Sequence, residues 1–291
     1  MNLVRVAVMR ILVLILILLI SFVILYDIVY APAKKYILPN IIWSYWHDRN
    51  IPKDVKRIID HRRRIMDSYE HIVLHEDTVW DYIDDAPPPN FDSLGHAHKA
   101  DWIRLVLLKK YGGCWMDASI IVNSKEAIDT LFNNARKKRV DLSAFYLDTR
   151  TFRKQPHTYI ENWFIIAPKQ SPLIQKWLNE YEYAIRIGFE QYKKQVHVRI
   201  PKYNRFSTYL TQHVCLQIVI QKSWVLPNID LSKAEDSMFK IHSTCWKYED
   251  KAGECIMNKI RTDKTIPSIV PFIKLTNGER KTGIDISSYF E

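Results

Sequence analysis

The stretch from 98 to 119, HKADWIRLVLLKKYGGCWMDAS, constrains the fold more than any other part of this chain. Its first half is apolar on nearly every side of a helix, which is typical of a helix buried in a core. Gly112 and Gly113 follow in a chain that has only seven glycines. Gly112 stands where a helix C-cap glycine belongs. The apolar run that ends at Asp117 completes the pattern, which predicts a buried helix, a tight turn and a strand with a carboxylate at its end.

Segments with strand-like and helix-like patterns alternate through the rest of the chain. We expect strands at 40–46, 70–76, 114–122, 141–147 and 162–167, and helices at 53–69, 77–85, 96–111, from 124 onward, at 172–187 and at 206–222. Such alternation predicts an α/β fold in which helices cover both faces of one sheet. Residues 33–291 are enough for one such domain with a full core.

The N-terminal part of the chain has a different composition. Residues 11–26, ILVLILILLISFVILY, are apolar except for Ser21, and with their flanks they reach the roughly 20 residues that a helix needs to cross a bilayer. A cleaved signal peptide is the alternative, because APA at 31–33 offers small residues near a cleavage point, but the apolar run is long for one. We therefore expect a signal anchor at 1–32 with a spanning helix at about 9–30. The protein would be single-pass with a cytoplasmic N-terminus, in the Golgi or ER (type II) or in a bacterial inner membrane.

Charge and cysteine content leave several partners open. The formal charge of +10 and the pI of about 9.3 suit nucleic acid, an anionic membrane, a phosphate-bearing substrate or a solvated basic face. The basic runs at 56–64 and 135–139 lack the interleaved aromatics of a single-strand binding groove, so we expect no nucleic-acid partner. Cys245 and Cys255 are close enough in sequence to close a small loop in an oxidising compartment, and the sequence leaves that compartment open.

Two ionisable residues interrupt the predicted buried helix. Asp101 and Arg104 stand three positions apart and therefore share a face. One interpretation is an internal salt bridge, and the other is a polar pair in a cleft that hydrogen-bonds the hydroxyls of a sugar. Asp117 follows a strand, where open α/β sheets bind ligands, and a carboxylate there can hold Mg²⁺ or Mn²⁺ against phosphate oxygens. A lone aspartate at a strand end is also often a simple turn residue.

The combination of these features resembles a known family. ADWIRLVLLKKYGGCWMDAS, at 100–119, is similar to the pattern SD-x-x-R-x-x-x-L-x-x-x-GG-x-Y/W-x-D-x-D of the DxD-type glycosyltransferases of the sugar-binding-region superfamily. Within that superfamily, the chain is most similar to the capsular polysaccharide synthesis proteins, which are related to mannosyltransferases and to the glucosylating clostridial toxins. The resemblance continues in LPNIIWSYWHDRNIP at 38–52, in ENWFIIAPKQSPLIQKWLNEY at 161–181 and in PFIKLT at 271–276.

The resemblance implies a GT-A fold, a Rossmann-like mixed sheet flanked by helices that binds a nucleotide-sugar. It implies that Asp101 and Arg104 hold the hydroxyls of the donor sugar, that Asp117 contacts the ribose or the metal-bound pyrophosphate, and that the aromatic stretch around Trp43 lies near the base. The implied donor-binding residues are Trp43, Asp101, Arg104, Asp117, Ser119 and Asn162. The implied partners are a nucleotide-sugar donor and a glycan or lipid-linked acceptor.

The chain departs from the family pattern at Ser119, which stands in place of the second aspartate. A hydroxyl is a weaker and neutral ligand, although serine binds Mg²⁺ in phosphate-binding loops. His242 is a candidate for a further ligand, so the expected metal site is Asp117 with His242, holding Mn²⁺ or Mg²⁺. Alternatively, lysines and arginines neutralise the leaving group in place of the metal.

We therefore predict a membrane-anchored glycosyltransferase of polysaccharide or surface-glycan biosynthesis, which transfers a sugar from a nucleotide-sugar to a glycan or lipid-linked acceptor. The alternative is a catalytically inactive, membrane-tethered sugar-binding or interaction subunit of the same fold, which the neutral Ser119 favours. The presence of all three other ionisable residues of the pattern favours the enzyme. The catalytic base is unknown from the sequence, and the possible bases are Asp148, Glu161 and His213.

Overall fold

The computed structural model describes residues 2–30, 35–151, 158–197 and 207–291. The chain divides into two compact units, Met1–Tyr36 and Ile37–Glu291. The first unit contains helix α1 (Asn2–Tyr30), whose side chains from 8 to 22 are exposed. Among the described residues, no helix is both long enough and apolar enough to cross a membrane.

The second unit is built on a mixed sheet, which among the described residues has six strands in the order β2-β1-β3-β6-β5-β7. β1 pairs in parallel with β2 and β3, β5 pairs in parallel with β7, and β6 runs antiparallel to β3 and β5. These strands are β1 (Ile41–Tyr45), β2 (Glu70–Leu74), β3 (Gly113–Met116), β5 (Leu142–Tyr146), β6 (Ile160–Ala167) and β7 (Ile229–Lys233). A smaller antiparallel sheet joins β4 (Ile120–Val122) to β8 (Phe272–Lys274).

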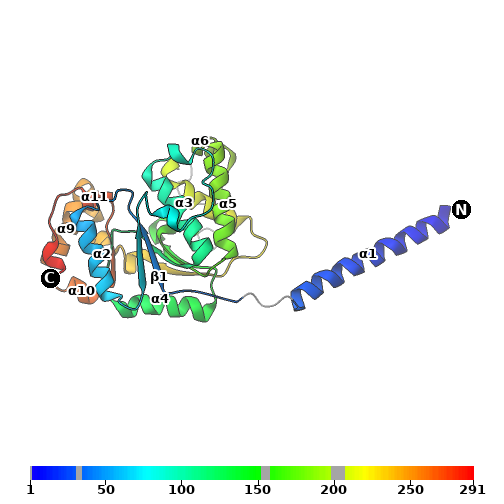
Figure 1. Ribbon diagram of the computed structural model, residues 1–291, viewed down its shortest axis with the longest axis horizontal. Coiled ribbons are helices and arrows are strands. Elements are labelled where there is room, and N and C mark those ends of the chain that lie inside the picture. The colour runs from blue at the N-terminus through cyan, green and yellow to red at the C-terminus, as the bar shows by residue number, and fades with distance from the viewer. Residues whose placement is uncertain (1, 31–34, 152–157, 198–206) are drawn as a thin grey trace. The chain divides into compact units, whose positions relative to one another are not determined.

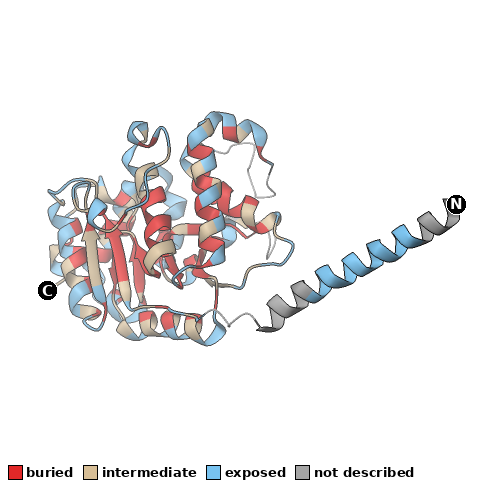
Figure 2. Ribbon diagram, turned by 45° about the vertical axis from the view of Figure 1, so that its right-hand side comes forward, coloured by how far each residue is buried: buried red, intermediate tan, exposed pale blue. Residues whose placement is uncertain are grey.

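Helices cover both faces of the large sheet (Figure 1). α3 (His96–Tyr111) and α5 (Pro172–Ile187) lie on one side of it, and α4 (Lys125–Lys138) lies on the other. Buried residues gather on the strands and on the helix surfaces that face them (Figure 2). The other α-helices of this unit are α2 (Lys53–Ile65), α6 (Phe189–Gln195), α7 (Thr211–Gln221), α8 (Lys240–Cys245), α9 (Ala252–Thr262), α10 (Ile266–Ile269) and α11 (Asn277–Arg280). The predicted α/β class, a mixed sheet flanked by helices, is confirmed.

The buried helix and its two glycines form as the sequence predicts. Every residue of α3 from 101 to 108 is buried. A Cβ on Gly112, at φ 71°, would lie 2.4 Å from the backbone nitrogen of Lys169, and a Cβ on Gly113, at φ 96°, would lie 2.6 Å from the carbonyl oxygen of Ile41. Glycine is therefore required twice, by backbone angles that other residues rarely adopt and by close approach of two other chain segments.

The strand predicted at 114–122 is two strands in two different sheets. β3 ends at Met116 and β4 begins at Ile120, and the backbone N–H of Ile120 donates to the carbonyl oxygen of Asp117 at 3.1 Å. The chain thus crosses from the large sheet to the small one at Asp117. The helix predicted at 77–85 is also different, because only a 3₁₀ turn forms there.

The C-terminal part of the chain forms a second, smaller core that the sequence patterns did not predict. Apolar side chains of α2, α8 and α9 pack there around the two strands of the small sheet. A disulfide joins Cys245 and Cys255, whose Cα atoms are 5.8 Å apart, whereas Cys114 and Cys215 are buried free thiols. This core fixes β8 against β4 and so sets what the end of β8 contacts.

Candidate functional site

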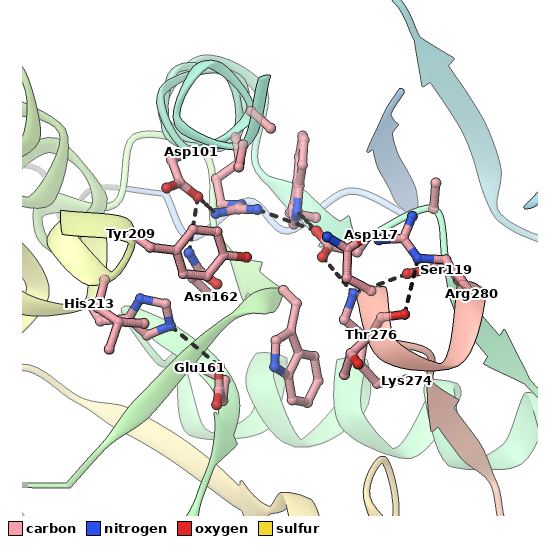
Figure 3. Close-up of a pocket in the computed structure, with 18 of the residues that line it drawn as sticks. Asp101, Asp117, Ser119, Glu161, Asn162, Tyr209, His213, Lys274, Thr276 and Arg280 are labelled. Atoms are coloured by element: carbon pink, nitrogen blue, oxygen red, sulfur yellow. Dashed lines mark hydrogen bonds and ion pairs between the residues drawn. The ribbon is translucent and has the colours of Figure 1, made fainter. Parts of the chain in front are cut away.

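A cavity of about 1170 Å³ lies where the two sheets meet, with walls from β3, β6, α3, the turn between β3 and β4, and the segment after β8 (Figure 3). This volume is slightly larger than the usual range of ligand-binding pockets, which is about 300–1,000 Å³. The predicted site residues that line it are Asp101, Arg104, Asp117, Ser119, Asn162 and His242. The fold therefore brings together six residues from four parts of the chain, which are α3, the turn between β3 and β4, β6 and α8.

Trp43 is the predicted site residue that lies elsewhere. Its ring is buried in the core against Tyr82 and Tyr111, and its Nε1 donates to the carbonyl oxygen of Gly112 at 2.9 Å. Trp46, the first residue after β1, lines the cavity. Of the aromatic stretch around Trp43, Tyr45 and Trp46 therefore line the cavity and Trp43 does not.

Arg104 is the centre of a hydrogen-bond network on one wall. Its Nη1 donates to the carboxylate of Asp101 and to Oε1 of Gln212, and its Nη2 lies 3.3 Å from Oδ1 of Asp117. Asn162 donates to Oδ1 of Asp101 at 3.1 Å and to Oε1 of Gln212 at 2.6 Å. The salt-bridge interpretation of the helical pair is therefore confirmed. Asp101 and Arg104 also line the cavity, and their contact with a sugar stays a prediction. Sequence reasoning missed Gln212, which no motif marks.

Asp117 accepts hydrogen bonds on both carboxylate oxygens. Oδ1 accepts from Nε1 of Trp115 at 2.9 Å and from Arg104, and Oδ2 accepts from Nζ of Lys274 at 2.8 Å. Burial alone would raise the pKa of the Asp117 carboxyl, but the positive charges of Lys274 and Arg104 outweigh burial and lower that pKa. The carboxylate is therefore ionised at neutral pH and faces two cations.

A third cation, Arg62 of α2, lies behind Asp117 and is fully buried. It donates to the carbonyl oxygen of Asp117 and to Oγ of Ser44, both at 2.9 Å. Burial lowers the pKa of Arg62 to about 10, so it stays charged at neutral pH. Part of the basic run at 56–64 is thus structural. The sequence indicates that Arg62 is buried, because Arg62 continues the helical spacing of the apolar residues of α2.

Lys274 and Ser119 meet because the two short strands pair. Lys274 lies opposite Ile120 in the small sheet, and its Nζ donates to Oγ of Ser119 at 3.1 Å. That hydroxyl itself donates to the carbonyl oxygen of Leu275 at 2.9 Å. The sequence pattern identifies PFIKLT only as a closing run and indicates no role for its lysine.

The predicted metal ligands are not arranged as a metal site. The Nε2 atom of His242 lies 3.7 Å from Oε1 of Glu279, so this histidine pairs with Glu279. Asp117 and Ser119 both accept hydrogen bonds from Lys274. Across the described ranges of the chain, no group of three or more His, Cys, Asp or Glu side chains is placed to hold a metal ion. These residues do not fit Mn²⁺ or Mg²⁺, which need several free oxygen ligands.

The opposite wall of the cavity carries an acid–base pair. Nε2 of His213 lies 3.3 Å from Oε2 of Glu161, and both side chains are buried (Figure 3). The ring of Tyr159 stacks on that of His213. Asp148 lies outside the residues that line the cavity, and its carboxylate pairs with Lys233 at 2.9 Å. Of the three possible bases, Glu161 and His213 therefore line the cavity and Asp148 does not.

The family described as capsular polysaccharide synthesis protein matches residues 27–269. This chain belongs to that family. The predicted resemblance is confirmed for residues 27–269, which include the cavity-lining residues from Tyr45 to Trp246. The PFIKLT segment at 271–276 and the lining residues Lys274 and Arg280 lie beyond the match.

Two curated relatives match about half of the chain. The O-glycosyltransferase PaGT of Phomopsis amygdali is 28% identical over 153 residues, which cover 47% of this chain and 36% of the relative. The O-glycosyltransferase braB of Annulohypoxylon truncatum is 27% identical over 160 residues, which cover 48% of this chain and 36% of the relative. The match thus spans about a third of the length of each relative.

Two solved structures are also similar. A glycosyltransferase involved in the glycosylation of the major capsid of PBCV-1 has 9% identity and a TM-score of 0.44, with 83% of this chain and 97% of that chain covered. The glycosyltransferase GlyE of Streptococcus pneumoniae TIGR4 has 8% identity and a TM-score of 0.46, with 87% of this chain and 60% of that chain covered.

Proposed function

We propose that this chain is a glycosyltransferase that transfers a sugar from a nucleotide-sugar to a hydroxyl of a glycan or lipid-linked acceptor. The observation that carries the proposal is the position of Asp101, Arg104 and Asp117 on one wall of a cavity large enough for a nucleotide-sugar. The family, and the names of the two O-glycosyltransferase relatives, support it.

The network on α3 and β6 suits the donor sugar. A carboxylate, an amide and a guanidinium, from Asp101, Asn162 and Arg104, offer both donors and acceptors to hydroxyl groups. Their hydrogen bonds to one another hold them in place before a ligand arrives, so binding needs little further ordering. The ring of Trp46, which lines the cavity, supplies apolar contact near a base.

The reaction breaks the bond between the anomeric carbon and the diphosphate oxygen, and the electron pair stays on the diphosphate. The oxygen of the acceptor hydroxyl bonds to that carbon and gives its proton to the Glu161–His213 pair, which lies across the cavity from Asp117 (Figure 3). Positive side chains near Asp117 stabilise the charge that develops on the leaving group.

A catalytically inactive sugar-binding subunit is the second candidate function. It is favoured by Lys274, whose hydrogen bonds occupy the two residues that stand at the positions of the family's DxD carboxylates. The two candidates differ in turnover. Both bind a nucleotide-sugar, but only the enzyme releases a nucleoside diphosphate from it.

We also propose that the chain is held at a membrane with its second unit in an oxidising compartment. The apolar run at 11–26 supports an anchor, and the disulfide between Cys245 and Cys255 supports that compartment. Alkaline carbonate washing of membranes from cells that make the full chain tests the anchor. Retention in the pellet is expected, and release of the full chain into the wash contradicts it.

Both candidate functions require binding of a nucleotide-sugar, and a binding measurement tests that requirement. We expect calorimetric titration of the full chain with UDP-glucose, UDP-galactose and GDP-mannose to show saturable binding of at least one of them. Asp101→Asn should weaken that binding roughly tenfold or more, because it removes a charged acceptor from the network. Asp60→Asn, on the outer face of α2, is the matched control. Equal affinity of Asp101→Asn and the control contradicts the assignment of this wall to the sugar.

A further inference from the structure

Lys274 brings a buried ammonium group to the place where the family pattern has its two carboxylates. The residue is only 8% exposed, and its Nζ lies 2.8 Å from Oδ2 of Asp117 and 3.1 Å from Oγ of Ser119 (Figure 3). An ammonium group has three N–H donors, so these two contacts leave one for a ligand in the cavity. The chain therefore has a fixed cation at this point.

A divalent ion does not fit beside this ammonium. Mg²⁺ requires oxygen ligands at about 2.0–2.1 Å in a nearly octahedral arrangement. Both oxygens of Asp117 already accept hydrogen bonds, and Ser119 accepts one from Lys274 while donating its proton to Leu275. An ion on these oxygens would also stand next to a like charge, which is unfavourable in a partly buried site.

Arg280 adds a second positive charge to the same wall. Its Nε donates to the carbonyl oxygen of Thr276 at 3.2 Å, and Nη2 donates to Oδ1 of Asn277 at 3.0 Å. Its guanidinium lies over the ring of Trp46, 5.4 Å from the centroid. Within the described residues it forms no ion pair with a carboxylate, so its charge is available to an anion in the cavity.

We propose that Lys274 and Arg280 together hold the diphosphate of the nucleotide-sugar, and that this takes the place of a divalent metal ion. The proposal rests on the proposed function and names how that site binds its leaving group. When the bond to the anomeric carbon breaks, the electron pair remains on the diphosphate oxygen, whose charge both side chains stabilise. Lys274 keeps its proton, and the acceptor's proton leaves on the other side of the cavity.

Binding of diphosphates without metal tests this directly. The full chain, treated with EDTA, is titrated with UDP, GDP and inorganic pyrophosphate in a calorimeter, and the titrations are repeated with Mn²⁺ and with Mg²⁺. We expect saturable binding in EDTA that either metal changes by less than about twofold. Lys274→Met should weaken it roughly tenfold or more, since a charged hydrogen bond is lost. Lys56→Met, on the exposed face of α2, is the matched control.

The outcomes separate this inference from the proposed function. Binding of the nucleoside diphosphates, or turnover of a donor, that occurs only with Mn²⁺ or Mg²⁺ overturns the inference and leaves the glycosyltransferase standing. Failure of every probe to bind, with and without metal, overturns both. The comparison of EDTA with metal uses the unaltered chain, so it holds even where Lys274→Met does not fold.

Discussion

Nζ of Lys274 lies 2.8 Å from Oδ2 of Asp117, although 157 positions separate the two residues in the chain. The contact exists because the chain leaves the large sheet at Asp117 and immediately forms β4, which pairs with β8. It joins the aspartate of the family pattern to a cation that the pattern does not contain. The charge balance of the cavity is thereby set by the fold, before any ligand binds.

Removing this cation and restoring the second carboxylate should create a metal site. We expect the double variant Lys274→Ala, Ser119→Asp to be stimulated several-fold or more by Mn²⁺ in donor hydrolysis, because two carboxylates then face the cavity without an ammonium between them. Ser119→Asp alone is the control, and there the lysine should keep the metal effect small. Equal responses to Mn²⁺ in the two variants would show that Lys274 does not govern metal use.

The paired glycines should be intolerant of a side chain. Gly112→Ala places a Cβ 2.4 Å from a backbone nitrogen at a positive φ, so we expect a loss of about 1–3 kcal/mol or more in the free energy of unfolding. Gly95→Ala is the matched control, because a Cβ there meets nothing within 4 Å and φ is −65°. Denaturant titration of both variants measures the difference. Equal losses would contradict a steric origin.

Glu279 should make stability depend on pH in the acid range. Burial alone would raise the pKa of the Glu279 carboxyl, but its contacts with His242 and Thr276 lower it from 4.5 to about 2. Since the pKa is lower in the folded state than in the unfolded state, the ionised carboxylate stabilises the fold. This contribution to the free energy of unfolding is complete above pH 4.5 and is lost as the pH falls from 4.5 toward 2. At one pKa unit per 1.36 kcal/mol it amounts to up to about 3 kcal/mol.

Comparison of the unaltered chain with Glu279→Gln measures this contribution. The difference between their free energies of unfolding should be largest at pH 6 and should shrink steadily on acidification below pH 4.5, because glutamine does not titrate. A difference that stays constant from pH 6 to pH 3 would mean that the carboxylate charge contributes nothing.

The Glu161–His213 pair should act on the acceptor and not on the donor. Glu161→Gln keeps the shape of the side chain but removes the charge beside the imidazole ring. We expect transfer to the acceptor to fall about 10²-fold or more, the size of effect typical of general-base catalysis, with the Kd of the nucleoside diphosphate unchanged. Asp148→Asn, outside the cavity, is the control. A loss of donor binding in Glu161→Gln would show that the Glu161–His213 pair contacts the donor and not the acceptor.

The parts of this structure that could be predicted from the sequence are those with local causes. The bounds of α3 follow from its apolar run and from Gly112 at its end, and the start of α4 follows from Ser124, whose hydroxyl accepts a hydrogen bond from the N–H of Ala127. The Asp101–Arg104 pair follows from helical spacing. Asp117 is indicated by its place at the end of a predicted strand. Family resemblance supplied Asn162, which local patterns alone would have left as an ordinary polar residue.

The parts that could not be predicted depend on contacts between distant segments. Lys274 lies in a three-residue strand whose partner no local pattern specifies. Trp43 and Trp46 are equally aromatic, and only the position of β1 between β2 and β3 decides that Trp43 is in the core. One strand is predicted at 114–122 although Asp117 interrupts its apolar run, because the residues on both sides of Asp117 are buried and strand-like.

Turnover of a nucleotide-sugar is the most direct test of the central claim. The full chain is incubated with a panel of UDP-, GDP- and CMP-sugars, in EDTA and with Mn²⁺, beside Asp117→Ala and the exposed control Asp60→Ala, and released nucleotide is measured. We predict that one donor is turned over in EDTA by the unaltered chain and by the control, and that Asp117→Ala loses this activity. Folded protein that binds a donor but turns over none in either condition would contradict the enzyme and favour the sugar-binding subunit.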